Sequence, residues 1–158
     1  MTKAFIQSPL GGLELIGSAA GLSAVIFKDA EAMPVSEKIP EELQDAVHQL
    51  EEYFDGKRKD FSLKLALEGT DFQKRVWKQL QEIPYGKTMS YQEMANRLGD
   101  PKVIRAAASA NGKNPISIII PCHRVIGSDG SLTGYAGGLH RKKWLLEHES
   151  PSPQQSLF

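Results

Sequence analysis

The stretch ISIIIPCHRVIG, residues 116–127, places the only cysteine of the 158-residue chain between an apolar run and two basic side chains. The apolar residues 118–120 predict a buried strand. Pro121 cannot donate a hydrogen bond to a sheet ladder, so we expect the chain to leave the sheet there and to present the thiol of Cys122.

Cys122 has two interpretations. A lone cysteine is usually a small, buried structural residue. A reactive cysteine works as its thiolate, whose ordinary pKa is about 8.5, and therefore needs a nearby cation or general base. His123 and Arg124 follow it directly, and this neighbourhood favours a nucleophile.

Composition limits what the chain can be. With 41% hydrophobic residues it can form a core as one or two small domains without disulfides or metal. A single cysteine excludes an internal disulfide, and we expect neither a metal site nor a cofactor. No apolar run approaches the roughly 20 residues of a membrane span, and the N-terminus lacks the apolar core of a signal peptide, so we expect a cytoplasmic protein.

The net charge is zero, but the charges are unevenly divided. Residues 1–68 carry seven Lys and Arg against twelve Asp and Glu, whereas residues 69–158 carry twelve against seven. Chance partition of surface charge is one explanation. The other is that the half containing Cys122 is suited to a polyanion such as DNA.

The first 68 residues predict a small α+β domain with a structural role. Apolar-rich runs at residues 4–8, 13–18 and 22–27 are separated by turn residues, as in an antiparallel meander. Helical spacing predicts that Glu41–Phe54 covers this sheet, and alternation over residues 61–67 predicts one more strand.

Residues 69–149 predict a second, mostly helical domain. Ser90 and Glu93 have the spacing of a capping box that opens a helix over residues 91–98, and Pro101 suits the first position of another helix. Two short helices joined by a tight turn predict a helix-turn-helix. The alanine-rich second helix is equally typical of a packed core helix.

The end of this domain contains a loop and a helix. Residues 131–138 are glycine-rich around Tyr135 and can lie close to a planar ligand. Leu139–Glu149 predicts a helix that buries Leu139, Leu145 and Leu146, with Trp144 at its edge and Arg141, Lys142 and Lys143 in solvent. Residues 150–158 are rich in Ser, Pro and Gln and predict a disordered tail.

The sequence PCHRV, residues 121–125, resembles the active-site signature of the O6-alkylguanine-DNA alkyltransferases, also called methylated-DNA–protein-cysteine methyltransferases. The resemblance is strong over about residues 70–149 and extends to the N-terminal half only in general layout. Further matching residues, in the family's order, are Tyr85-Gly86, Ser90-Tyr91, Arg105, residues 111–115 (NGKNP), residues 134–139 (GYAGGL) and residues 144–149. Some members carry a zinc site with cysteine ligands in the N-terminal domain, and this chain departs from that pattern.

The resemblance implies a set of catalytic roles. Cys122 accepts the alkyl group, His123 acts as its base through a water, and Glu149 orients the histidine. Tyr91 donates a hydrogen bond to the guanine, and Asn114 braces the active-site turn. Such an arrangement follows the logic of a catalytic triad with a different electrophile.

The resemblance also implies binding residues. Tyr135 packs on the alkylated base, and the other substrate-binding residues are Val125, Ala136, Gly137 and Lys142. Arg105 enters the base stack in place of the flipped nucleotide, and the other DNA-binding residues are Ser90, Lys102, Ala106, Asn111 and Arg124.

The implied function is repair of duplex DNA that contains O6-alkylguanine or O4-alkylthymine, by irreversible transfer to Cys122 in a single turnover by a monomer. A cysteine hydrolase would use the same Cys-His pair but leave the helix-turn-helix without a purpose. A helix-turn-helix regulator would make Cys122 incidental. A non-catalytic damage sensor of this family carries tryptophan at the cysteine position, whereas this chain has Cys122.

The tail has a motif of its own. Residues 154–158, QQSLF, resemble the pentapeptide with which many bacterial replication and repair proteins bind the sliding clamp. Gln154, Leu157 and Phe158 would make the contact, after an extended Ser-Pro spacer. A match this short also arises by chance.

Overall fold

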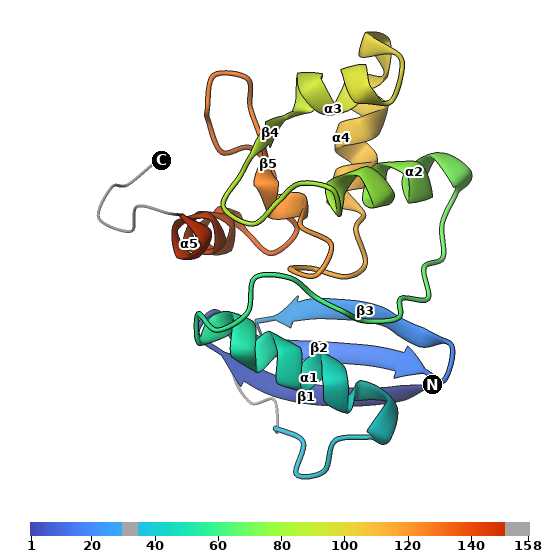
Figure 1. Ribbon diagram of the computed structural model, residues 1–158, viewed down its shortest axis with the longest axis vertical. Coiled ribbons are helices and arrows are strands. Elements are labelled where there is room, and N and C mark those ends of the chain that lie inside the picture. The colour runs from blue at the N-terminus through green and yellow to red at the C-terminus, as the bar shows by residue number, and fades with distance from the viewer. Residues whose placement is uncertain (30–34, 151–158) are drawn as a thin grey trace. The chain divides into compact units, whose positions relative to one another are not determined.

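The computed structural model describes residues 1–29 and 35–150, and they form two compact units. The first unit contains residues 1–68 and takes in residues 115–117. The second contains residues 69–114 and the chain from residue 118 onward. The overall class is α+β, as predicted, with a small antiparallel sheet in the first unit and mostly helices in the second (Figure 1).

The first unit is a three-stranded antiparallel meander covered by one helix (Figure 1). Its strands are β1 (Thr2–Ser8), β2 (Gly11–Ser18) and β3 (Gly21–Lys28), and its helix is α1 (Glu41–Phe54). The apolar side chains of α1 recur every three or four residues and form one buried face against the sheet. This face consists of Leu43, Ala46, Val47, Leu50 and Tyr53. The three predicted strands and the predicted helix are confirmed.

The strand predicted over residues 61–67 is wrong. Only Leu65 pairs with the sheet, through one parallel bridge to Leu22. The open edge of β3 is divided between two segments, because Val25 accepts a bond from Ser117 and donates one to Pro115, at 3.1 and 3.0 Å. Residues 61–67 therefore have too little strand edge available to extend a ladder.

Up to residue 150, where the description of the chain ends, the second unit is built from four α-helices and a pair of two-residue strands. The helices are α2 (Asp71–Leu80), α3 (Tyr91–Arg97), α4 (Ile104–Gly112) and α5 (Leu139–Glu149). Strand β4 (Met89–Ser90) pairs in parallel with β5 (Val125–Ile126). Thr70 caps α2 through a reciprocal capping box with Gln73. Trp77 on α2 ties this helix to α4, because its indole Nε1 donates to the Ala110 carbonyl at 2.8 Å.

Helices α3 and α4 pack together around a tight turn. The Ser90 hydroxyl accepts from the Glu93 amide at 3.0 Å, while the Glu93 carboxylate lies 3.7 Å from Arg97. Gly99 has a φ of 99°, a conformation that glycine adopts without penalty. The 3₁₀ turn η1 (Pro101–Val103) then precedes α4, so the second helix begins three residues later than predicted.

Residues 118–120 are buried as predicted, but they form a turn rather than a strand. Pairing with β3 ends at Ser117, and Ile118 then has a φ of 74°. A β-branched residue rarely adopts this left-handed conformation, and it redirects the chain. The Ile120 carbonyl, which a strand would pair with a neighbouring strand, accepts from Asn114 Nδ2 at 2.8 Å.

Helix α5 has the predicted bounds but different buried residues. Leu139 is 48% exposed, whereas Arg141 and Lys142 are 5% and 0% exposed. Both cations reach carbonyls of the preceding loop: Arg141 Nη1 donates to Gly137 at 3.1 Å and Lys142 Nζ to Thr133 at 2.7 Å. Composition suggested solvent for these side chains, but their ends find acceptors inside the domain.

Candidate active site

Cys122 begins the 3₁₀ turn η2 (Cys122–Arg124), immediately after Pro121. Its amide donates to the Ile120 carbonyl at 2.8 Å. The thiol is not presented on the surface as the sequence suggested, because the residue is only 5% exposed. Burial raises the pKa of the thiol, against the opposing effects of a hydrogen bond from Asn114 and the charge of Lys142. The resting thiol is therefore protonated at neutral pH and needs a base.

Asn114 connects the turn to the thiol. Its Nδ2 donates to the Ile120 carbonyl at 2.8 Å, and its side chain also hydrogen-bonds Cys122. One amide thus holds the backbone just before the cysteine and favours the thiolate. This is the bracing position that the family resemblance implies for Asn114.

His123 and Glu149 meet in the interior of the unit. His123 Nε2 lies 2.8 Å from Glu149 Oε2, and the two side chains are 0% and 2% exposed. An ionised carboxylate only accepts hydrogen bonds, so Nε2 carries the proton and Nδ1 carries the lone pair. Among the described residues Nδ1 has no hydrogen-bond partner.

The protonation states of this pair follow from burial and charge. Burial lowers the pKa of His123, although the Glu149 carboxylate opposes that shift. Burial alone would raise the pKa of Glu149, but the neighbouring His123 and Arg124 hold it at about 2. Because His123 is neutral near pH 7, Arg124 is the permanent cation beside Glu149. A neutral imidazole with a free Nδ1 lone pair is able to accept a proton.

Arg124 is wrongly predicted as a DNA-binding residue. It is 6% exposed, and its guanidinium grips Glu149 with two nitrogens, Nε to Oε1 at 2.7 Å and Nη2 to Oε2 at 3.1 Å. Its third nitrogen, Nη1, donates to the Ile83 carbonyl. All three nitrogens have partners inside the protein, so this side chain is not available to a phosphate.

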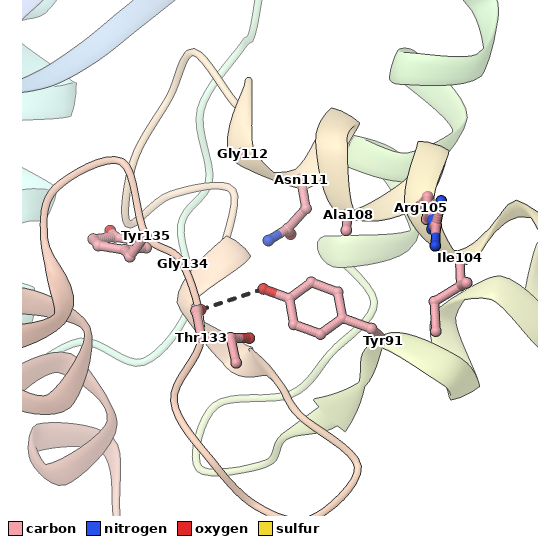
Figure 2. Close-up of a pocket in the computed structure, with 9 residues that line it drawn as sticks. All are labelled: Tyr91, Ile104, Arg105, Ala108, Asn111, Gly112, Thr133, Gly134 and Tyr135. Atoms are coloured by element: carbon pink, nitrogen blue, oxygen red, sulfur yellow. Dashed lines mark hydrogen bonds between the residues drawn. The ribbon is translucent and has the colours of Figure 1, made fainter.

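A cavity of about 520 Å³ opens between α4 and the glycine-rich loop. Figure 2 shows Tyr91 projecting between these two elements, with the Asn111 side chain directed toward its hydroxyl. The Tyr91 hydroxyl donates to the Thr133 carbonyl at 3.5 Å, a long and weak bond. The cavity brings together four predicted site residues and five that were not predicted as site residues. The first set is Tyr91, Arg105, Asn111 and Tyr135; the second is Ile104, Ala108, Gly112, Thr133 and Gly134.

Lys142 contacts two of the residues that line the cavity, Tyr91 and Thr133. Its ammonium is 5.8 Å from the centre of the Tyr91 ring and donates to Thr133. Burial lowers the pKa of Lys142 to about 8. Burial also raises the pKa of Tyr91, so the phenol keeps its proton as a hydrogen-bond donor.

The other predicted substrate-binding residues are not among those that line the cavity. Val125 is 0% exposed in β5, opposite Met89. Ala136 is exposed, and Gly137 is buried with its carbonyl bonded to Arg141.

The predicted DNA-binding residues fall into two groups. Lys102, Arg105 and Ala106 are exposed around the start of α4. Ser90 and Asn111 are less accessible. The Ser90 hydroxyl caps α3, and Asn111 is 4% exposed and lines the cavity wall. The tail residues Gln154, Leu157 and Phe158 lie outside the described part of the chain.

Within residues 1–29 and 35–150, no group of three or more His, Cys, Asp and Glu side chains is placed to hold a metal ion. Nor does this part of the chain contain a helix of the length and apolar character needed to cross a membrane.

Comparison with known proteins covers nearly the whole chain. Family models for the 6-O-methylguanine DNA methyltransferase match twice, with the ribonuclease-like domain over residues 1–67 and the DNA binding domain over residues 71–151.

Individual relatives agree with this match. The methylated-DNA–protein-cysteine methyltransferase of Methanosarcina barkeri is 52% identical over 148 residues, 91% of this chain and 94% of the relative. The protein of that name from Mycobacterium tuberculosis is 48% identical over 147 residues, 91% and 89% of the two chains. The crystal structure of Mycobacterium tuberculosis OGT in complex with DNA matches with a TM-score of 0.84 and 46% identity, covering 99% of this chain and 98% of that one.

Proposed function

The chain belongs to the 6-O-methylguanine DNA methyltransferase family, and from this membership we propose that it repairs DNA by moving the alkyl group of O6-alkylguanine onto its own Cys122. The observation that carries the assignment is the buried Cys122, followed directly by a neutral His123 that is bonded to an ionised Glu149. This arrangement supplies a nucleophile and the base that its protonated thiol requires.

The transfer is a displacement at the alkyl carbon. The Cys122 thiol gives its proton to Nδ1 of His123, directly or through one water. The thiolate sulfur forms a bond to the alkyl carbon, the bond from that carbon to O6 breaks, and its electron pair stays on the guanine. The phenol of Tyr91 donates a hydrogen bond to the base as this charge develops. The guanine anion takes up a proton from solvent and the imidazolium of His123 returns the thiol proton to solvent, so the products are guanine and a thioether. No group on the chain reverses the thioether, so each molecule acts once.

The alkylated base must leave the duplex to reach this site, because a buried thiol cannot approach O6 inside a base stack. The cavity beside Tyr91 is open to such a base. Arg105 is exposed at its edge, on the first turn of α4, and would fill the gap in the stack. The small side chains of α4 allow its backbone to approach a minor groove closely.

The rival functions explain less. A cysteine hydrolase needs an acyl substrate and gives no role to Arg105. A regulator gives no role to the Cys122, His123 and Glu149 arrangement. A non-catalytic damage sensor would lack the cysteine, which is present.

The assignment is tested by Cys122→Ala. This variant should lose alkyl transfer completely yet bind alkylated duplex DNA as the wild type does, because the thiol contacts no phosphate. Transfer is measured with a radiolabelled O6-methylguanine duplex and binding by fluorescence anisotropy. Residual transfer by the variant would refute the role of Cys122.

We also propose the oligomeric state, the cellular location, a second DNA lesion and a partner protein. We expect a monomer in the cytoplasm that also accepts O4-alkylthymine. The motif with Gln154, Leu157 and Phe158 would recruit it to a sliding clamp. Titration of clamp with the full chain should give a complex that Leu157→Ala/Phe158→Ala abolishes, and no binding by the wild type would refute this role.

A further inference from the structure

Arg124 is a buried cation to which the proposed reaction has assigned no role. Its guanidinium holds Glu149 in a two-point grip at 2.7 and 3.1 Å, and Nη1 is anchored on the Ile83 carbonyl. The Tyr85 ring packs over it, with the guanidinium carbon 5.8 Å from the ring centre. The guanidinium is planar and is held in place by its bond to the Ile83 carbonyl. Because it also donates to both oxygens of the Glu149 carboxylate, it fixes the orientation of that carboxylate.

The orientation of Glu149 determines what His123 can do. Oε2 is the oxygen shared by Arg124 and His123, at 3.1 and 2.8 Å. While Glu149 is ionised, Oε2 accepts the Nε2 proton of His123 and leaves the lone pair on Nδ1. A rotated or protonated carboxylate would release the imidazole to adopt its other tautomer, which has no base on Nδ1.

The charge of Arg124 matters as much as its shape. Without a neighbouring positive charge, the Glu149 carboxylate would favour the protonated form of the buried His123. A protonated imidazole has no lone pair to accept the proton of the thiol. The Arg124 guanidinium supplies one positive charge beside Glu149.

We propose that Arg124 is a positioning residue of the transfer reaction, which keeps Glu149 ionised and oriented and balances its charge so that His123 stays neutral with its lone pair on Nδ1. This inference rests on the proposed function. It replaces the DNA-binding role that the sequence suggested for Arg124.

Other charged groups also act on His123. Lys142 on α5 lowers the pKa of His123, as Arg124 does, whereas Glu149 on the same helix raises it. Cys122 is the adjacent residue on η2, and Tyr85 is a neutral phenol whose pKa is raised chiefly by burial. Removal of Arg124 leaves Glu149 facing His123 with Lys142 as the remaining cation, so the net effect is a higher pKa for His123.

The test is the pH profile of benzyl transfer from free O6-benzylguanine, which removes DNA binding from the measurement. Full-length wild type, Arg124→Met and Arg124→Lys are compared in single-turnover reactions from about pH 5.5 to about pH 9, a range that brackets the ordinary histidine pKa. At low pH the transfer rate falls because His123 becomes protonated, and we call this fall the acid limb of the profile. In Arg124→Met the acid limb should move to higher pH by about one unit or more. Below the titration of His123 the rate should fall about tenfold for each pH unit of the shift, and it should recover toward the wild-type value at high pH. Arg124→Lys keeps the charge and should keep the limb in place.

A purely structural role predicts a different result. It would lower the rate of Arg124→Met by the same factor at every pH, and that outcome overturns the proposal. If the wild type itself takes up no benzyl group, the proposed function fails instead, so the two failures are distinguishable.

A double variant covers the case in which Arg124→Met does not fold. Arg124→Met/Glu149→Gln removes both buried charges and leaves none unpaired. If Arg124 acts through Glu149, the double variant should transfer at the rate of Glu149→Gln alone, within about twofold. A further loss of tenfold or more would show that Arg124 acts independently and would overturn the proposal.

Discussion

At the scale of single residues, the Glu149 carboxylate explains most of the electrostatics of the site. It is 2% exposed and bonded to both His123 and Arg124. A buried anion with one partner removed is strongly destabilised, because the remaining charge stays without its counter-ion. The stability of the unit and the state of the base therefore depend on the same carboxylate.

The pH dependence of stability should show this directly. The pKa of Glu149 is held at about 2, below its ordinary 4.5. Because the folded pKa is the lower one, the stabilisation is present above about pH 4.5 and is lost as the pH falls toward about 2. We expect the urea midpoint of the wild type to fall across this window and that of Glu149→Gln to fall less. At pH 7, Glu149→Gln should cost about 3–5 kcal/mol because Arg124 loses its anion.

The matched control is Glu147→Gln on the same helix. Glu147 is partly exposed, with its side chain 41% accessible, and lies 4.0 Å from Lys143 in a surface pair, which contributes about 0–1 kcal/mol. It should keep the wild-type pH dependence. Equal behaviour of the two variants would contradict the role assigned to Glu149.

The sequence could identify His123 and Glu149 only through the family motif, because 26 residues separate them. Arg124 and Lys142 were harder to place. A basic residue next to a cysteine or in an amphipathic helix is normally solvated, and composition does not reveal a buried acceptor. Their partners, Glu149 and the Thr133 carbonyl, are known only from the folded chain.

At the scale of elements, α4 has two different faces. Ala107 and Ala110 are buried, whereas Arg105 and Ala106 are exposed. The sequence left open whether this helix was a packed core helix or a DNA-binding helix. Its buried residues pack as in a core helix, and its exposed residues are the ones for which we propose the DNA-binding role. The strand predicted over residues 118–120 failed for a different reason, since apolar character indicates burial but not backbone conformation.

Arg105 should matter for duplex repair far more than for the chemistry. Only the duplex requires a base to be extruded and its gap filled. We expect Arg105→Ala to slow repair of an O6-methylguanine duplex by at least about tenfold and to leave the rate with free O6-benzylguanine nearly unchanged. Both rates are measured in single-turnover reactions.

Lys113→Ala is the control for charge. Lys113 is exposed just after α4 and is not among the residues that line the cavity, so this variant removes one positive charge without touching the site. It should weaken duplex repair only slightly. Equal loss on both substrates in Arg105→Ala would place Arg105 in the chemistry instead.

At the scale of the whole molecule, the excess of acidic residues and the candidate site belong to different units. Residues 1–68 carry the excess of acidic residues and a sheet with one covering helix, while the groups of the candidate site all belong to the second unit. Local patterns predicted the meander and the helices well because each is specified by its own spacing of apolar residues. The role of residues 115–117, which belong to the first unit, depends on pairing with distant Val25 and has no local signal.

The most direct test of the central claim is the intact mass of the protein after incubation with an excess of O6-methylguanine duplex DNA. We expect every molecule to gain the mass of a single CH₂, with peptide mapping placing it on Cys122. No second addition should appear, because the thioether cannot react again. An unchanged mass alongside restored guanine, or a methyl group on another residue, would contradict the account.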